Sequence, residues 1–205
     1  MNQRTDTHPQ MLIVRARRGD TQALGLVLDS FRNYLKLMAR LQIHRGLQGK
    51  LDPSDLVQDT YLETQRYIGT FRGATEQEFL VWLRQILART VTERIRRYYG
   101  TRQRDVRLER SIDEQLDQSS QRLDRGLVDK GRSPSSAAQQ REWSVMLANA
   151  LEQLPAHYRE ALVLRNLEQL PFPEVARRMA RSVASVEKIW IRAIAALRSA
   201  LGAEL

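Results

Sequence analysis

The chain has 205 residues, and 42% of them are hydrophobic, which suits one large or two small globular domains. It carries 33 Lys and Arg against 24 Asp and Glu, and the resulting net charge of +9 favours a polyanionic partner such as nucleic acid. The absence of cysteine excludes disulfides, thiolate zinc sites and thiol nucleophiles. A protein without disulfides is usual in the cytoplasm. The apolar run Met11–Val14 is too short for a signal peptide or a membrane span, so we expect a cytoplasmic protein without membrane insertion.

Helical spacing of apolar residues dominates the first part of the chain, and no alternating strand pattern occurs. A first short helix is expected to end at Gly19, with Asp20 as the N-cap of the next helix. That second helix is predicted as one continuous element over residues 21–41. Gly46 and Gly49 are expected to break it.

Two further helices have clear start signals. Asp52 is a predicted N-cap for a helix over residues 53–68 that begins with proline, where a missing N–H costs nothing. Thr75 and Glu78 have the spacing of a capping box, which predicts the start of a long helix that ends near Gly100.

Residues 101–135 have mixed charges, many Gln and Ser, and weak apolar periodicity, which predicts a flexible linker. Apolar stripes at helical spacing resume after it. We therefore expect an all-α protein with two small helical domains, residues 10–100 and 136–205, joined by this linker.

The last two predicted helices have helix-turn-helix spacing. Pro173 can open a short helix, and Ser182 can cap a second one after a turn of three to four residues. The polar face of the second helix offers hydroxyls and cations that could enter a major groove: Ser185, Lys188, Arg192 and Ser199. The alternative is an ordinary amphipathic helix with a solvated side. The apolar run Ile189–Ile191 is expected to belong to the core.

The long helix that starts after Thr75 also has a mixed polar face opposite its apolar stripe. Its cations could hold phosphates, while Trp82 and the preceding loop around Phe71 could receive a base that has left the duplex. The alternative places Phe71 and Trp82 in the core. The other members of this candidate surface are Arg72, Gln85, Arg89, Glu93, Arg96 and Arg97.

An acidic face is unusual in so basic a chain. Asp55, Asp59 and Glu63 follow one another at i, i+4 and i+8 with Gln58 beside them, and like charges at this spacing repel. Leu56, Val57, Tyr61 and Leu62 are expected on the buried side. A metal-dependent nuclease would need carboxylates from more than one element, so a docking surface for a basic protein or a merely solvated face fits better.

These segments together resemble a known family. The motifs are DLVQDTYLE (55–63), FRG (71–73), FLVWLRQILARTVTERIRR (79–97) and the stretch LEQLPAHYREALVL to IAALRSAL (151–201). In this order they resemble the extracytoplasmic-function (ECF) bacterial sigma factors. The resemblance implies sigma region 2 in residues 10–100 and region 4 in residues 136–205. It also implies a subunit that binds core RNA polymerase and directs promoter recognition, DNA melting and transcription initiation, without being an enzyme.

The resemblance implies a role for each candidate residue. Asp55, Gln58, Asp59 and Glu63 would dock on the clamp helices of the largest polymerase subunit. Recognition of the −10 element would fall to Phe71, Arg72, Arg89, Glu93, Arg96 and Arg97. Recognition of the −35 element would fall to Ser185, Glu187, Lys188 and Arg192. Residues 101–135 would run towards the RNA exit channel.

The chain departs from the family pattern at three positions. Arg89 stands where members often have Asn, and Ile189 and Ile194 stand where they often have Arg. The alternative function is a stand-alone helix-turn-helix regulator that binds DNA as a dimer. No cofactor is expected, no histidine pair has metal-ligand spacing, and the sequence leaves open whether an anti-sigma factor regulates the protein.

Overall fold

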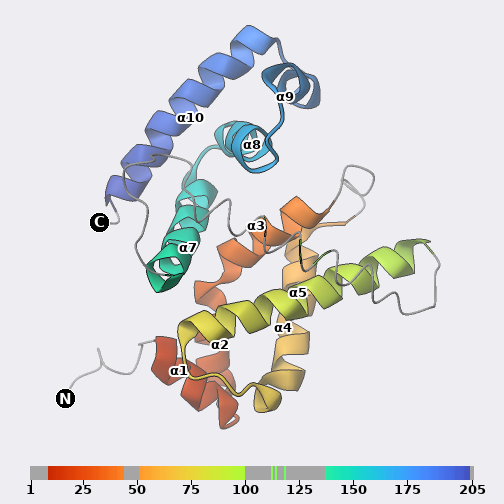
Figure 1. The fold of residues 1–205 in the computed structure, drawn as a ribbon, viewed down its shortest axis with the longest axis vertical. Coiled ribbons are helices and arrows are strands. Elements are labelled where there is room, and N and C mark those ends of the chain that lie inside the picture. The colour runs from red at the N-terminus through yellow and green to blue at the C-terminus, as the bar shows by residue number, and fades with distance from the viewer. Residues whose placement is uncertain are drawn as a thin grey trace. The chain divides into compact units, whose positions relative to one another are not determined.

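The computed structural model describes residues 9–43, 51–99 and 137–203, together with positions 112, 114 and 118. Throughout these residues the secondary structure is helical, without a β-strand, which confirms the all-α prediction (Figure 1). The chain forms two compact units, residues 1–117 and 118–205. The predicted helix breaks at Gly46, Gly49 and Gly100 lie outside the described residues, as does nearly all of the predicted linker.

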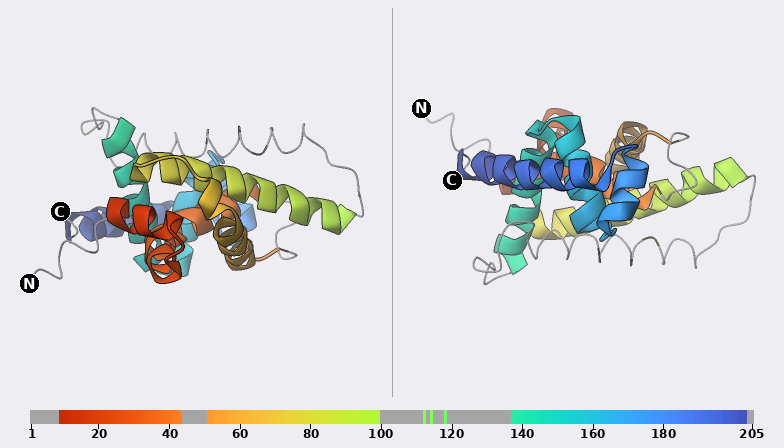
Figure 2. Two further views of the ribbon diagram at one scale, coloured as in Figure 1. Left: turned by 90° about the horizontal axis from the view of Figure 1, so that it is seen from below. Right: turned by 90° about the horizontal axis from the view of Figure 1, so that it is seen from above.

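In the first unit, α5 packs across α4 and also contacts α3 and α1 (Figure 2). The elements of this unit are α1 (Pro9–Arg17), α2 (Thr21–Ser30), α3 (Arg32–Gln42), α4 (Pro53–Tyr67), the single 3₁₀ turn η1 (Ile68–Thr70) and α5 (Glu76–Tyr99).

The prediction of one helix over residues 21–41 was wrong. The chain bends at Phe31, between α2 and α3, where the backbone adopts φ −99° and ψ −1°. The Phe31 ring is buried, and its centroid lies 6.0 Å from that of Phe79 in α5. Since no Gly or Pro marks the bend, the sequence carries no local signal for it, and tertiary packing of Phe31 accounts for the interruption.

The predicted helix caps are confirmed. The Asp20 carboxylate accepts a hydrogen bond from the backbone N–H of Ala23 at 2.9 Å, and the Asp52 carboxylate accepts one from the N–H two residues on at 2.7 Å. The Thr75 hydroxyl accepts from the Glu78 N–H at 3.2 Å, and the Glu78 carboxylate accepts from the Thr75 N–H at 3.0 Å. Hydrogen bonds from backbone N–H groups and the Thr75 hydroxyl hold the pKa of Glu78 below its usual range.

The buried side of α4 differs from the prediction at one position. Leu62 is 55% exposed, whereas Thr60 and Thr64 are fully buried. Each threonine hydroxyl donates to the carbonyl four residues earlier at 2.7 Å, so burial leaves no unsatisfied polar group. Tyr61 is half-buried, and its hydroxyl donates to the Leu28 carbonyl at 2.6 Å, which joins α4 to α2.

In the second unit, α10 packs against α7, α8 and α9 (Figure 2). The elements are α7 (Ala137–Gln153), α8 (Ala156–Leu162), a turn of π-helix η2 (Val163–Leu167), α9 (Phe172–Arg178) and α10 (Val183–Ala203). The helical segment that begins at Ala156 therefore widens into a π-turn for its last five residues.

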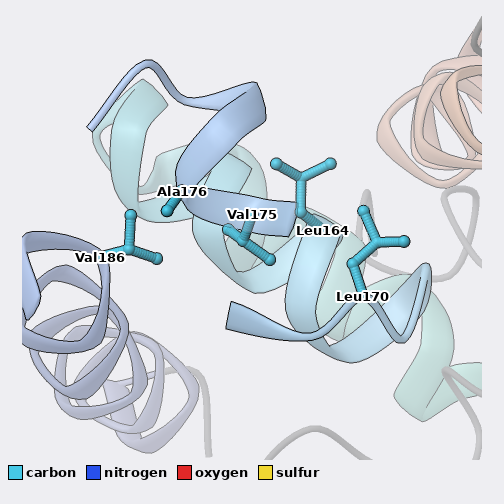
Figure 3. Close-up of a cluster of buried hydrophobic side chains, with 5 residues drawn as sticks. All are labelled: Leu164, Leu170, Val175, Ala176 and Val186. Carbon is cyan, nitrogen blue, oxygen red and sulfur yellow. The ribbon is translucent and has the colours of Figure 1, made fainter. Parts of the chain in front are cut away.

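The α9–α10 pair forms the predicted helix-turn-helix. The Ser182 hydroxyl accepts a hydrogen bond from the Ser185 N–H at 3.3 Å, which confirms the expected cap. Side chains from η2, the following loop and both helices make one buried cluster beneath the turn (Figure 3). The cluster contains Leu164, Leu170, Val175, Ala176 and Val186.

The turn itself places a non-glycine residue in the left-handed region. Ala180 has φ +51°, and the N–H of Arg181 donates to the Ala176 carbonyl at 3.0 Å in the pattern of a Schellman motif. Glycine is the usual residue at this position, because a Cβ atom costs about 1–2 kcal/mol in this conformation.

We therefore expect Ala180→Gly to stabilise the protein by about 0.5–1 kcal/mol, since relief of the Cβ strain exceeds the added entropy of the unfolded chain. Urea unfolding followed by circular dichroism measures the change. Ala195→Gly is the matched control, because Ala195 is an exposed residue inside α10, where glycine should cost about 1 kcal/mol. Equal destabilisation by both changes would contradict the interpretation.

Candidate functional site

The acidic face of α4 is only partly available to a partner. Asp55 and Gln58 are exposed, whereas Asp59 and Glu63 are half-buried. Asp59 lies opposite Arg94 of α5: Nε of Arg94 donates a hydrogen bond to Oδ2 of Asp59 at 2.5 Å, and Nη2 lies 2.5 Å from the same oxygen. This hydrogen bond raises the pKa of Arg94. Arg94 could not be found from the sequence, because 35 residues separate it from Asp59 and only the packing of α4 on α5 brings the two together.

The remaining charges of this region also form local pairs. Glu63 binds Arg66 at 2.6 Å within α4, and Glu93 binds Arg89 at 3.3 Å within α5. The Arg89 guanidinium lies 5.6 Å from the centroid of the Tyr67 ring. Acidic and basic side chains therefore meet between α4 and α5, and the two helices do not present cleanly separated charges.

A pocket of about 170 Å³ opens where these side chains meet. Its wall contains three carboxylates and three guanidinium groups, so it is polar and close to balanced in charge. The lining residues are Asp59, Leu62, Glu63, Arg66, Thr90, Glu93, Arg94 and Arg97. Arg97 is exposed and Arg96 is half-buried, and both belong to the predicted DNA-binding set.

A larger and more apolar groove of about 410 Å³ lies between α2 and α4. Gln58 and the exposed Leu62 of α4 line one side, so the α4 face offers apolar surface beside its polar groups. The other lining residues are Thr21, Leu24, Gly25, Leu28, Tyr61 and Gln65. The sequence could have suggested this groove only through Leu62, which helical periodicity assigned to the core.

The loop between α4 and α5 is packed onto the aromatic core. Phe71 is 5% exposed, and its ring centroid lies 5.4 Å from that of Phe79 and 5.1 Å from that of Trp82. Its ring is thus occupied by core contacts in this conformation, as in the alternative interpretation given for Phe71. Trp82 is half-buried, and Arg72 is exposed.

Gly73 holds this loop close to the core. A Cβ atom at position 73 would collide with the Phe71 ring and with the side chain of Glu78. The Arg17 guanidinium of α1 also donates a hydrogen bond to the Gly73 carbonyl at 3.0 Å. The FRG motif is therefore fixed by its glycine and by a distant helix.

On α10, the predicted reading residues lie as expected on the outer face. Glu187, Lys188 and Arg192 are exposed, and Ser185 is half-buried in the first turn. These four residues are the part of the predicted DNA-binding set that α10 supplies.

The apolar run Ile189–Ile191 is not uniformly core, contrary to expectation. The Trp190 indole packs edge-to-face on Phe172 at 5.7 Å and donates to the Asn166 side chain at 2.8 Å. Ile191, in contrast, is 62% exposed. The difference follows from helical geometry, because consecutive residues point about 100° apart around the axis.

Ion pairs tie α9 to the segment before it. Arg178 is largely buried and binds Glu168 at 2.7 Å and Glu174 at 3.4 Å. Hydrogen bonds from Arg177 and Arg178 lower the pKa of Glu174 to about 2, so its carboxylate stays ionised throughout the physiological range. The charges on α9 therefore mainly position the helix.

The described part of the chain holds neither a candidate membrane span nor a candidate metal cluster. Residues 9–43, 51–99 and 137–203 contain no helix long and apolar enough to cross a membrane. Over the same residues, no group of three His, Cys, Asp or Glu side chains could hold a metal ion.

Comparison with known proteins identifies both units. Residues 30–100 match the model of Sigma-70 region 2, and residues 144–197 match that of Sigma-70, region 4. The RNA polymerase sigma-H factor of Pseudomonas aeruginosa is 28% identical over 96% of this chain and 95% of its own length. The ECF RNA polymerase sigma-E factor of Escherichia coli is 24% identical over 90% of this chain and 89% of its own.

Two further similarities are weaker in coverage or in shape. The ECF RNA polymerase sigma factor BldN of Streptomyces coelicolor is 26% identical over 91% of this chain, which spans 63% of BldN. A solved structure of CnrH in complex with the cytosolic domain of CnrY covers 96% of this chain and 98% of its own at 22% identity. Its TM-score of 0.34 is too low for an argument from overall shape.

Both sigma regions occur in order on a helical framework, and the curated relatives align along nearly the whole chain. The chain belongs to the sigma-70 family of RNA polymerase sigma factors, in its ECF group. As a sigma factor it serves promoter recognition and transcription initiation together with core RNA polymerase.

The Asp59–Arg94 contact should contribute measurably to the stability of the first unit. We expect a double-mutant cycle of Asp59→Ala and Arg94→Ala to give a coupling energy of about 0.5–1 kcal/mol, as for a partly exposed, hydrogen-bonded ion pair. Urea unfolding of the four proteins measures it. The control cycle of Glu63→Ala and Arg66→Ala should give about 0.3 kcal/mol, because that pair joins neighbouring turns of one helix. A coupling energy of zero for Asp59 and Arg94 would contradict the role assigned to the contact.

Proposed function

We propose that the α4 face docks on the clamp helices of the largest RNA polymerase subunit. The observation that carries this proposal is the combination of exposed polar groups and exposed apolar surface on one helix: Asp55 and Gln58 stand beside Leu62 at the α2–α4 groove. A basic partner helix could pair with Asp55 and cover the groove, which joins electrostatic selection to apolar burial.

Asp59 and Glu63 would contribute less to docking than Asp55. Arg94 and Arg66 already neutralise their carboxylates, so these two residues attract a basic partner less strongly than Asp55 does. Both Arg94 nitrogens bind the same oxygen, Oδ2, of Asp59. Oδ1 can accept a hydrogen bond from polymerase while the pair persists.

For the −10 element, we propose that the cations of α5 and its preceding loop hold the DNA backbone. Arg72 and Arg97 are exposed and could reach phosphates, while Arg89, Glu93 and Arg96 complete the surface along α5. The role that we propose for Phe71 is to hold this loop in place, because its ring is packed on Phe79 and Trp82.

For the −35 element, we propose that α10 lies in the major groove and contacts DNA through Ser185, Glu187, Lys188 and Arg192. The exposed positions of Glu187, Lys188 and Arg192 in the first half of the second helix of a helix-turn-helix support this arrangement. DNA opening would draw on binding energy, with no nucleotide hydrolysis and no cofactor. We further propose that the protein has no catalytic activity of its own and acts in the cytoplasm, and that an anti-sigma factor is a further partner.

Charge reversal of Asp55 tests the docking proposal. We expect Asp55→Arg to reduce co-purification of core RNA polymerase at least tenfold, because a buried like-charge contact replaces a favourable one at the interface. Helix content by circular dichroism should not change, since Asp55 is exposed. Glu142→Arg on α7 is the matched control, because it reverses an exposed acidic residue outside the proposed surface. Unaltered association of the Asp55→Arg protein would overturn the docking assignment.

Removal of two cations tests the −35 proposal. We expect Lys188→Ala with Arg192→Ala to lower transcription from promoters that carry a −35 element, and to reduce the salt dependence of promoter binding by about one unit of slope for each lost phosphate contact. In vitro transcription over a salt series measures both effects. Arg177→Ala, which removes an exposed cation from α9, should have a smaller effect. Equal losses of transcription in the double variant of Lys188 and Arg192 and in the Arg177→Ala variant would argue against a specific role for α10.

A further inference from the structure

The most exposed large apolar side chain among the described residues lies on the proposed DNA-reading helix. Ile191 of α10 is 62% exposed. The core of the unit does not require it there, because the opposite side of α10 already buries Val186, Ala193 and Leu197 completely. Its two apolar neighbours in sequence, Ile189 and Trp190, are half-buried. Ile191 alone in this run points into solvent.

Charged side chains surround Ile191 on the outer face of α10. Helical spacing places Glu187 and Lys188 one turn before it and Arg192 directly after it, and all three are exposed. Ala184, two turns before, and Ala195, one turn after, are exposed as well. The small alanines leave the backbone accessible to a close partner, and Ile191 is the large apolar group on a face whose other long side chains are charged.

A DNA major groove offers one apolar group that fits this arrangement. The C5-methyl group of thymine is the apolar feature by which a protein distinguishes thymine in this groove, and the other base edges present hydrogen-bond donors and acceptors. Isoleucine is β-branched and therefore stiff at χ1 in a helix, so it can offer a fixed apolar surface at little cost in entropy. Lys188 and Arg192 can hold phosphates on either side.

We propose that Ile191 contacts thymine C5-methyl groups in the −35 element and makes this protein select thymine at one or two positions. The proposal rests on the proposed reading of the −35 element by α10. Single exposed apolar residues also occur on protein surfaces without a binding role, and a protein partner could cover such a residue. Both alternatives leave base preference independent of Ile191, and this difference can be measured.

The first experiment determines base preference with the complete protein. Core RNA polymerase with wild-type, Ile191→Ala or Ile191→Val protein transcribes a promoter library with a randomised −35 region, and the transcribed templates are sequenced. We expect the wild-type protein to enrich thymine at one or two positions. Ile191→Ala should lose that preference while other positions keep theirs, and Ile191→Val should keep most of it. Met11→Ala is the matched control, because it removes an exposed apolar side chain from α1.

The second experiment removes the methyl group from the DNA. Deoxyuridine replaces thymine at the enriched positions, which changes nothing else in the base pair. We expect wild-type holoenzyme to bind the substituted promoter about fourfold more weakly for each methyl group lost from contact, the effect of one buried methyl-sized group. Ile191→Ala holoenzyme should bind both promoters equally.

The outcomes separate this inference from the function on which it rests. If wild-type protein supports no transcription from any library member, the proposed function fails. If transcription occurs but thymine is not enriched, or is enriched equally by Ile191→Ala, the role of Ile191 is overturned while the proposed function stands. Insensitivity of the wild-type holoenzyme to deoxyuridine would also overturn it. Circular dichroism should show that Ile191→Ala folds, because an exposed isoleucine is replaced by a stronger helix former.

Discussion

The packing of α4 on α5 is the contact on which the first unit depends. It joins a helix that offers Asp55 and Gln58 to a helix that carries Arg89, Arg96 and Arg97, so one interface positions two proposed binding surfaces. The buried Thr60 and Thr64 satisfy their hydroxyls within α4, and the Asp59–Arg94 ion pair joins α4 to α5. A shift of one helix along the other would therefore disturb both surfaces together.

Much of the fold could be predicted because its signals are local. Asp20, Asp52, Thr75 and Ser182 mark helix starts by the chemistry of their own side chains, and their caps are confirmed. The bend at Phe31 could not be predicted, since it follows from contact with a residue 48 positions later, Phe79, without any local helix breaker. The general rule is that capping acts within one turn, whereas packing depends on the whole unit.

In the candidate site, too, some features have local sequence signals and others depend on tertiary packing. Family motifs indicated candidate residues on α4, α5 and α10, but they carried no information on which charges were already paired. Arg94 could not be found without the tertiary structure, and its contact changes how Asp59 would take part in docking. Leu62 and Ile191 were both expected in the interior, because a hydrophobic residue next to a buried stripe looks the same in sequence whether it faces the core or solvent.

The close approach at Gly73 restricts how the loop before α5 could evolve. No side chain fits at that position while Phe71 keeps its place. The backbone path of the loop and the packing of the aromatic cluster therefore depend on each other. Under the proposed contact of this loop with the −10 element, new promoter preferences would arise through outward-facing neighbours such as Arg72, whose replacement leaves the interior undisturbed. The loop can thus change its chemistry while its shape is inherited unchanged.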